Sequence, residues 1–233
     1  LTSVEIAVIG DSYVESQMMP ASQLATTKLS RLMRMPVANL GQSGYGPQQE
    51  LVVLKRYALP LHPKTVIWMF YEGNDLLNAR DYADMVSLLR SNLDSLDSFW
   101  DRAFTKNVLS WFMRSRRECI PNPREKSQSA RATVRDHEGK EHSLYINKEQ
   151  SHSVNLTKQE LDDLQTTISV IEEAYRLVQH EGVRFMVVFA PHTLRVYHDI
   201  AYFHRIDGGE ARWDLNDLPE RFRQMVAEIA PEI

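Results

Sequence analysis

The sequence predicts an α/β protein in which helices cover both faces of a parallel sheet, giving three layers, α/β/α. Two observations carry this prediction. Short apolar strands alternate with amphipathic helices along the chain, and one of these strands is apolar on both sides. Glycine and polar residues gather directly after the strands, where parallel sheets bind their ligands. We expect residues 1–233 to form a single domain.

The first strands and helices follow one another closely. Residues 4–10 (VEIAVIG) predict a buried strand, and 36–41 (PVANLG) predict a second one. Between them, 22–34 has the apolar spacing of a helix. Its expected inner face comprises Leu24, Ala25, Leu29, Leu32 and Met33. A further helix over 47–59 begins with a proline, which suits a first helical position. Its expected apolar side comprises Leu51, Leu54, Tyr57 and Ala58.

Residues 64–75 (KTVIWMFYEGND) predict the central strand, because the run from Val66 to Tyr71 is apolar on both faces. Residues 78–114 then predict helix, with an apolar stripe that we interpret as core packing rather than as a lid or an interface. The stripe comprises Leu93, Leu96, Phe99, Trp100, Phe104, Val108, Trp111 and Phe112.

Residues 115–153 are rich in charged side chains and lack this apolar periodicity, so we interpret them as a partly mobile insertion. Within them, 132–146 predicts a small hairpin that turns at Glu138-Gly139. The histidines of the insertion are expected to be solvated rather than to be ligands: His137, His142 and His152.

Regular structure is expected again from Thr157. The sequence TKQE at 157–160 is a capping box that starts a helix, and Gly182 is placed to end that helix. Residues 183–191 (VRFMVVFAP) predict another strand, and 218–230 predict a final helix.

Composition narrows the possible functions. Hydrophobic residues make up 43% of the chain, charged residues make up 25%, and the formal net charge is −4. No basic block stands out, so we expect no nucleic-acid partner. Cys119 is the only cysteine, and the sequence has no Cys/His zinc spacing. No apolar run approaches the length of about 20 residues that a helix needs to span a membrane. Neither a cofactor nor a metal is expected.

The polar strand ends suggest chemistry. Gly-Asp-Ser at 10–12 is either a simple turn or a serine nucleophile held at a strand tip. Acyl transfer needs a nucleophile and donors aimed at the developing oxyanion. Ser12 carries a hydroxyl and its own N–H, the segment GQSGYG supplies glycines, and Asn74 supplies an amide. His192 follows the fourth strand.

These blocks, in this order, resemble the GDSL or SGNH hydrolase superfamily. The matching blocks are Gly10-Asp11-Ser12, Asn39-Leu40-Gly41-Gln42-Ser43-Gly44 and Gly73-Asn74-Asp75. The match covers residues 4–78 well and the later elements loosely. The resemblance implies a flavodoxin-like sheet, Ser12 as nucleophile, and an oxyanion hole made by Gly44 and Asn74. It also implies ester substrates.

The family's final block, Asp-x-x-His, does not occur in these 233 residues, because none of the eight histidines has an aspartate three positions before it. We therefore expect the sequence to be truncated, its base to lie beyond Ile233, and no histidine in it to reach Ser12. His192 is a possible substitute base, although a surface loop is its plainer interpretation. The start at Leu1 suggests a removed leader or anchor, which favours an extracytoplasmic or membrane-anchored location over a cytoplasmic one.

The preferred function is a serine esterase or O-acyltransferase that acts on a small-molecule or carbohydrate acyl ester. The alternative is a non-catalytic SGNH-like domain that binds a carbohydrate or a partner, which the missing Asp-x-x-His block favours. A flavodoxin-like cofactor binder is a weaker third reading, because the first turn lacks a phosphate-binding glycine cluster.

Overall fold

The computed structural model describes residues 4–94, 129–147, 155–203 and 215–230. They form a mixed α/β fold around a four-stranded parallel sheet with the strand order β2-β1-β3-β6. The strands are β1 (Ile6–Gly10), β2 (Val37–Gly41), β3 (Thr65–Tyr71) and β6 (Arg184–Ala190). The predicted strands and their parallel pairing in one sheet are thereby confirmed.

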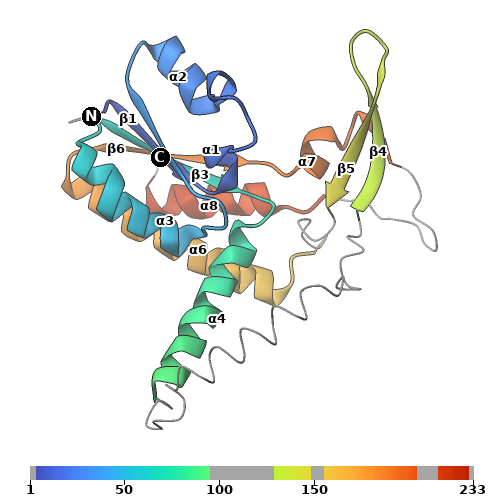
Figure 1. Cartoon of the computed structure of the whole chain (residues 1–233). Coiled ribbons are helices and arrows are strands. Elements are labelled where there is room, and N and C mark those ends of the chain that lie inside the picture. Colours follow the sequence, from blue (N-terminus) through green and yellow to red (C-terminus); the bar gives the residue numbers. More distant parts are fainter. Residues whose placement is uncertain (1–3, 95–128, 148–154, 204–214, 231–233) are drawn as a thin grey trace, which may run out of the picture.

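Helices lie between and after these strands (Figure 1). They are α1 (Ser12–Glu15), α2 (Ala25–Met33), α3 (Pro47–Val53), α4 (Asp75–Asp94), α6 (Lys158–His180), α7 (Thr193–Tyr197) and α8 (Leu218–Ile229). A 3₁₀ turn, η1 (Ala21–Gln23), precedes α2. A π-helical turn, η2 (Leu54–Ala58), and a 3₁₀ turn, η3 (Leu59–Leu61), follow α3.

The predicted ends of α6 are confirmed. The Glu160 amide donates to Thr157 Oγ1 at 3.2 Å, and the Thr157 amide donates to Glu160 Oε2 at 2.7 Å. These two bonds satisfy amides that a helix start leaves without partners. At the other end, Gly182 has a φ of +67°, which glycine adopts without strain after a helix.

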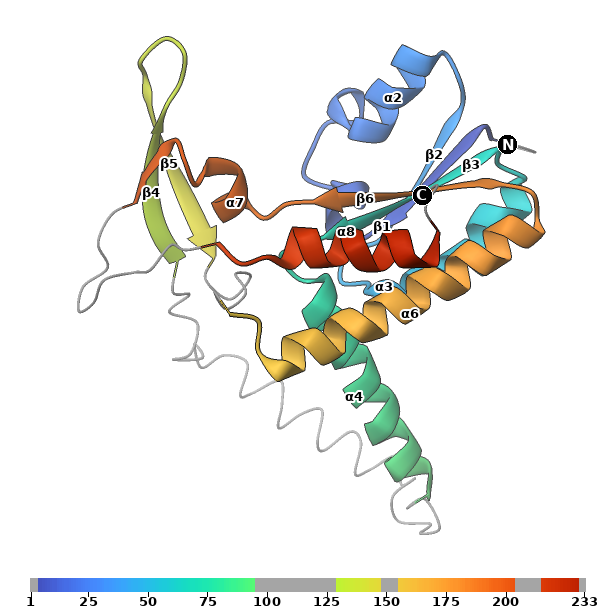
Figure 2. The same ribbon diagram turned by 180° about the vertical axis from the view of Figure 1, so that it is seen from behind.

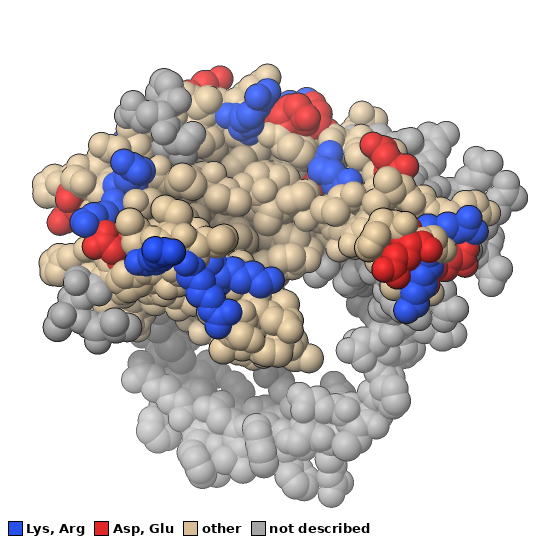
Figure 3. All heavy atoms as spheres, turned by 90° about the horizontal axis from the view of Figure 1, so that it is seen from above, with Lys and Arg blue, Asp and Glu red and all other residues tan. Residues whose placement is uncertain are grey.

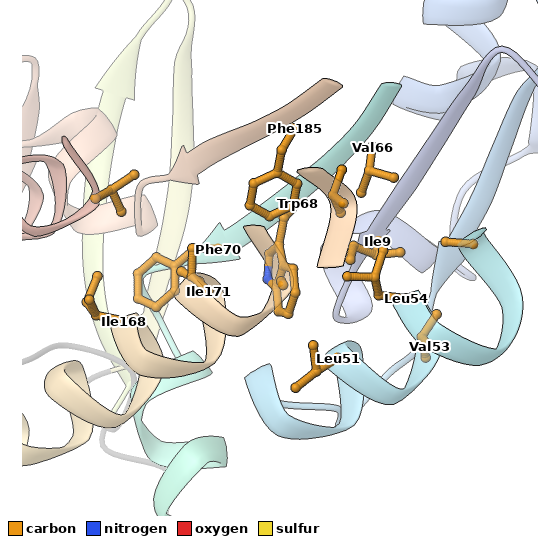
Figure 4. Close-up of a cluster of buried hydrophobic side chains, with 14 of the residues drawn as sticks. Ile9, Leu51, Val53, Leu54, Val66, Trp68, Phe70, Ile168, Ile171 and Phe185 are labelled. Atoms are coloured by element: carbon orange, nitrogen blue, oxygen red, sulfur yellow. The ribbon is translucent and has the colours of Figure 1, made fainter. Parts of the chain in front are cut away.

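One face of the sheet carries most of the core. Helices α3, α6 and α8 cover this face, and Figure 2 shows α6 and α8 side by side along it. Trp68 and Phe70, alternate residues of β3, point into it and are fully buried (Figure 4). Phe70 stacks on Phe222 of α8 with ring centroids 4.4 Å apart. Burial of these large side chains is the main favourable contribution to folding.

The opposite face, covered by α1 and α2, is packed more thinly. Ile6, Val8 and Val14 form its buried cluster. The predicted inner face of α2 is wrong in part, since Ala25 is exposed, Leu32 is 82% exposed and Met33 is 49% exposed, whereas Leu24 and Leu29 are half-buried. The reason is that α2 packs against β2, the edge strand, so part of its apolar side reaches beyond the sheet.

Tyr57 was likewise expected on the apolar side of its helix and is exposed instead. It lies in η2, where the π-helical winding changes the angle between successive side chains. The other three residues of that expected side, Leu51, Leu54 and Ala58, are buried.

A second, antiparallel sheet lies beside α7 (Figure 1). Its strands are β4 (Ser129–Arg135), β5 (Glu141–Asn147) and β7 (Ala201–Phe203), in the order β5-β4-β7. The predicted hairpin is confirmed, with Gly139 in its turn at a φ of +80°. The sequence did not predict β7 or α7, which are only a few residues long.

Some sequence predictions lie outside the described residues. They concern the apolar stripe over 96–112, residues 115–128 and 148–153 of the predicted insertion, and His152. The partial mobility of the insertion therefore stays a prediction. Of the two described insertion histidines, His137 is exposed, and exposed His142 pairs with Asp136 at 2.7 Å.

The described surface carries charges of both signs. Figure 3 shows basic and acidic side chains scattered over one face, with wide uncharged areas between them. Among the described helices, none has the length and apolar character that crossing a membrane requires.

Candidate active site

The carboxyl ends of the four parallel strands meet at one edge of the sheet. Ser12 follows β1, Gly44 lies in the loop after β2, and Asn74 follows β3. Because β1 lies between β2 and β3, the serine segment is flanked by the segments that carry the other two residues. His192 follows β6, the next strand along. The sheet order therefore gathers the predicted residues at adjacent positions.

The turn after β1 exposes Ser12. Asp11 is fully buried and caps α1, with its Oδ1 accepting from the Tyr13 amide at 2.8 Å. Ser12 Oγ donates to Asp11 Oδ2 at a longer 3.3 Å. The aspartate cap fixes the start of α1, and Ser12, the first residue of that helix, is exposed. Gly-Asp-Ser is thus a turn that also presents a serine hydroxyl at the surface.

The loop after β2 is tied to the serine segment. The Ser43 amide donates to Glu15 Oε2 at 2.7 Å, and the Gln42 amide donates to the Gly10 carbonyl at 3.0 Å. The hydrogen bonds of Ser43, its side chain first, lower the pKa of Glu15, so this acceptor stays ionised near neutral pH. Gly44 has a φ of +76° and stands in open space.

Asn39 joins α1 to β2, a role that was not predicted from the sequence. Its Nδ2 donates to the Val14 carbonyl at 2.7 Å, and its Oδ1 accepts from the Gly41 amide at 3.0 Å. A Cβ on Gly41 would lie 2.3 Å from the Glu15 nitrogen, so only glycine lets α1 approach β2 this closely. The Asn-x-Gly spacing alone does not predict this contact, because it is recognised only once α1 is known to lie against β2.

The Asn74 side chain is not used by the fold. It is half-buried, its Oδ1 is buried, and it makes no hydrogen bond with the part of the chain that the structure describes. Its backbone carbonyl accepts from the Asn78 amide at 2.8 Å, which fixes the residue at the start of α4. An uncommitted amide on a fixed backbone suits the binding of a developing negative charge.

Two tyrosines join the serine segment to the asparagine segment, and neither was predicted as a site residue. The rings of Tyr13 and Tyr71 stack with centroids 3.8 Å apart at 26°. The Tyr13 hydroxyl donates to the Tyr71 hydroxyl at 3.0 Å. Tyr71 also lies against Gly73, where a Cβ would come within 2.5 Å of the ring. The neighbour of Ser12 therefore contacts the residues that lead to Asn74.

His192 is buried, which corrects its interpretation as a surface loop residue. Its Nδ1 accepts from the Leu194 amide at 3.2 Å and so caps α7. Its own amide donates to Glu72 Oε2 at 2.9 Å. The ring of His192 lies 6.4 Å from that of Tyr71, centroid to centroid.

Glu72 links the segments that follow β3 and β6. Its carboxylate accepts two bonds from Arg195 Nε, at 2.9 and 3.0 Å, and one from Arg195 Nη2 at 2.6 Å. Arg195 Nη2 also donates to Asn216 Oδ1 at 2.8 Å. Glu72 and Arg195 are both largely buried, so their charges are compensated by a two-pronged pair. The expectation that no histidine reaches Ser12 stays a prediction, because His152 and His204 lie outside the described residues.

Three carboxyl groups, Asp11, Glu50 and Asp75, are fully buried behind the edge. Burial, and then the nearby Asp75 and Asp11, raise the pKa of Glu50 well above its usual range. Burial, and then Asp11, likewise raise the pKa of Asp75. The Trp68 indole N–H faces Glu50 and opposes the rise, although the two form no hydrogen bond of normal geometry. Their shared burial therefore favours the protonated forms of Glu50 and Asp75.

In the described ranges, no group of three or more His, Cys, Asp or Glu side chains is placed to hold a metal ion. A scan of protein-family models and a search of curated proteins both gave no match for this chain.

Proposed function

We propose that the chain forms an SGNH/GDSL-type domain of the three-layer α/β/α, flavodoxin-like kind. In this proposal it is a serine hydrolase that acts on ester bonds, as an acyl esterase or an O-acyltransferase. The observation that carries the proposal is the strand order β2-β1-β3. It supports the assignment because the segments of Gly44, Ser12 and Asn74 follow three neighbouring strands.

In the proposed mechanism, Ser12 Oγ attacks the carbonyl carbon of the ester. Its proton passes to a general base, which the resemblance implies to be a histidine oriented by an aspartate. We assign that role to no described residue. The oxyanion accepts from the Ser12 and Gly44 amides and from the Asn74 side chain. The alcohol leaves with a proton, and water or an acceptor hydroxyl then takes the acyl group from Ser12.

The second candidate is an SGNH-like domain that binds a carbohydrate or a partner without catalysis. It is favoured by one observation: the described bond of Ser12 Oγ goes to Asp11, at 3.3 Å, rather than to an imidazole.

Hydrolysis of p-nitrophenyl acetate by the full-length protein separates the two candidates. A hydrolase loses its turnover in Ser12→Ala, whereas Asn74→Ala costs about 10²- to 10³-fold in kcat, as the loss of one oxyanion donor does elsewhere. A fluorophosphonate probe should add its phosphonyl group to Ser12, and peptide mass spectrometry would locate it.

Ser169→Ala is the matched control, because Ser169 is exposed on α6 and its hydroxyl donates to the Gln165 carbonyl of the same helix. It should keep full activity. Turnover that survives Ser12→Ala, or an absence of both turnover and labelling in the unaltered protein, would favour the binding candidate.

A further inference from the structure

The residue after the proposed nucleophile is an aromatic side chain that is both exposed and held in place. Tyr13 is 46% exposed, whereas Tyr71, on which it stacks, is only 2% exposed. One face of the Tyr13 ring is therefore covered by protein, and the remainder is open to solvent. Nothing in the proposed chemistry at Ser12 uses this open surface.

Contacts of Tyr71 with neighbouring residues hold the pair in place. The Tyr71 ring lies against Gly73 and near the His192 ring. The Tyr71 amide donates to buried Asp75 Oδ2 at 2.7 Å. The Tyr13 hydroxyl is engaged with that of Tyr71, so Tyr13 is held by a stack and by a hydrogen bond. A ring restrained in this way loses little conformational entropy when a ligand packs on it.

Its place in the chain gives the open ring a relation to the reaction. Ser12 and Tyr13 are the first two residues of α1, and consecutive Cα atoms are about 3.8 Å apart. A substituent that extends from the ester group of a substrate at Ser12 toward Tyr71 would therefore meet the Tyr13 ring. The stacked ring offers a flat apolar surface, since its hydroxyl already has a partner.

We infer that the Tyr13–Tyr71 pair is a binding subsite for a six-membered ring carried by the ester substrate, with Tyr13 as the contacting residue and Tyr71 as its support. This inference rests on the proposed function, because it places the ring beside the serine that forms the acyl intermediate. It adds a substrate class: esters that carry an aromatic ring or a saturated six-membered ring close to the scissile bond.

Three acetate esters of similar leaving-group acidity test the inference: benzyl, cyclohexylmethyl and propyl acetate. The ratio of kcat/KM between variant and unaltered protein is measured for each, so intrinsic reactivity cancels. In Tyr13→Ala, the benzyl ester should lose about three- to tenfold more than the propyl ester, the range expected of one aromatic contact. Loss with the cyclohexylmethyl ester as well would indicate that any apolar six-membered ring is accepted, and loss with the benzyl ester alone would indicate that the ring must be aromatic.

Two variants separate ring contact from structural damage. Tyr13→Phe keeps the ring and should change the benzyl-to-propyl ratio by less than about twofold. Tyr57→Ala removes an exposed tyrosine of η2 and should change nothing. An equal loss for all three esters in Tyr13→Ala would overturn the inference, because it would mean that Tyr13 only positions α1.

Binding tests the subsite even if no ester is turned over. Benzyl alcohol is added to full-length Ser12→Ala protein labelled with ¹³C in its tyrosine rings, and Tyr13→Ala in that background identifies the Tyr13 signal. A saturable shift of this signal supports the ring subsite even where the proposed hydrolase activity fails. The subsite is contradicted if benzyl alcohol does not shift the Tyr13 signal and the unaltered protein does not hydrolyse the esters.

Discussion

The two faces of the parallel sheet are built differently. Helices α3, α6 and α8 cover one face with a continuous core that includes stacked and edge-on aromatic rings. The other face carries α1 and α2 over a small aliphatic cluster, and Leu32 of α2 is largely exposed. Ser12 and Tyr13 belong to this thinner face.

Polar contacts hold the thin face where apolar burial is limited. Asn39 bonds the Val14 carbonyl, Glu15 bonds the Ser43 amide, and Gly41 allows α1 to approach closely. Hydrogen bonds and steric fit depend strongly on geometry, so they fix the position of α1 without requiring a large core. We expect changes on the thick face to alter stability most, and changes on the thin face to alter the site.

The largest effect should come from the thick face, tested within one strand. Phe70→Ala should lower the free energy of unfolding by about 3–5 kcal/mol, because it leaves a cavity in the main core. Met69→Ala removes a half-buried side chain from the opposite face and should cost about 1–2 kcal/mol. Urea unfolding measures both. Equal losses would mean that the two faces contribute alike.

Gly41→Ala should have the next largest effect. Its new Cβ would meet backbone and side-chain atoms of Glu15 and Val14 at 2.3 and 2.6 Å. We expect a loss of about 1–3 kcal/mol, as for other overpacked sites, together with reduced esterase activity. Gly182→Ala is the control, since its φ of +67° causes strain of about 1 kcal/mol in open space far from α1. Unchanged activity in Gly41→Ala would disprove the role assigned to this contact.

The buried acids predict a dependence of stability on pH. The pKa of Glu50 is raised in the folded state, so above its usual value of 4.5 the folded protein retains a proton that the unfolded chain releases. Stability therefore falls as the pH rises above 4.5, until the folded pKa is reached. Glu50→Gln removes this ionisation and should make the stability curve flatter over that window.

Urea unfolding from pH 4 to pH 8 measures this slope. Glu228→Gln, at an exposed position of α8, is the control and should run parallel to the unaltered protein. If Glu50→Gln also ran parallel, folding would not raise the pKa of Glu50.

The smallest effect should come from the exposed tie between α1 and the Gly44 loop. Glu15→Ala removes the acceptor for the Ser43 amide and should lower kcat by about two- to fivefold, the size of an exposed charge-assisted contact. Glu15→Gln keeps a side-chain oxygen in reach and should restore most of this loss. A similar fall in both variants would indicate that the charge matters rather than the hydrogen bond.

Local patterns determined much of the fold. The apolar run over 65–71 places β3 in the centre of the sheet, because unbroken apolar residues need cover on both faces. The capping box at Thr157 and the glycine at 182 set the ends of α6, since these signals act through neighbouring backbone groups. The glycine in the hairpin turn is local in the same sense.

Contacts between distant segments could not be read in this way. The pattern of α2 predicts an apolar face but not how much sheet lies beneath it. The burial of His192 depends on Glu72, 120 positions earlier in the chain. Strands as short as β7 contain too few residues for a periodic signal, and β7 forms only because β4 offers it an edge.

For the candidate site, the sequence by itself determined which polar and glycine residues follow the first three strands: Ser12, Gly44 and Asn74. Only the tertiary structure decided that β1 lies between β2 and β3, that Tyr13 stacks on Tyr71, and that three carboxyl groups share one buried region. The physical reason is the separation along the chain over which each interaction acts. Capping, turn formation and strand propensity act over a few residues, whereas strand order, ring stacking and desolvation depend on residues that meet only when the chain has folded.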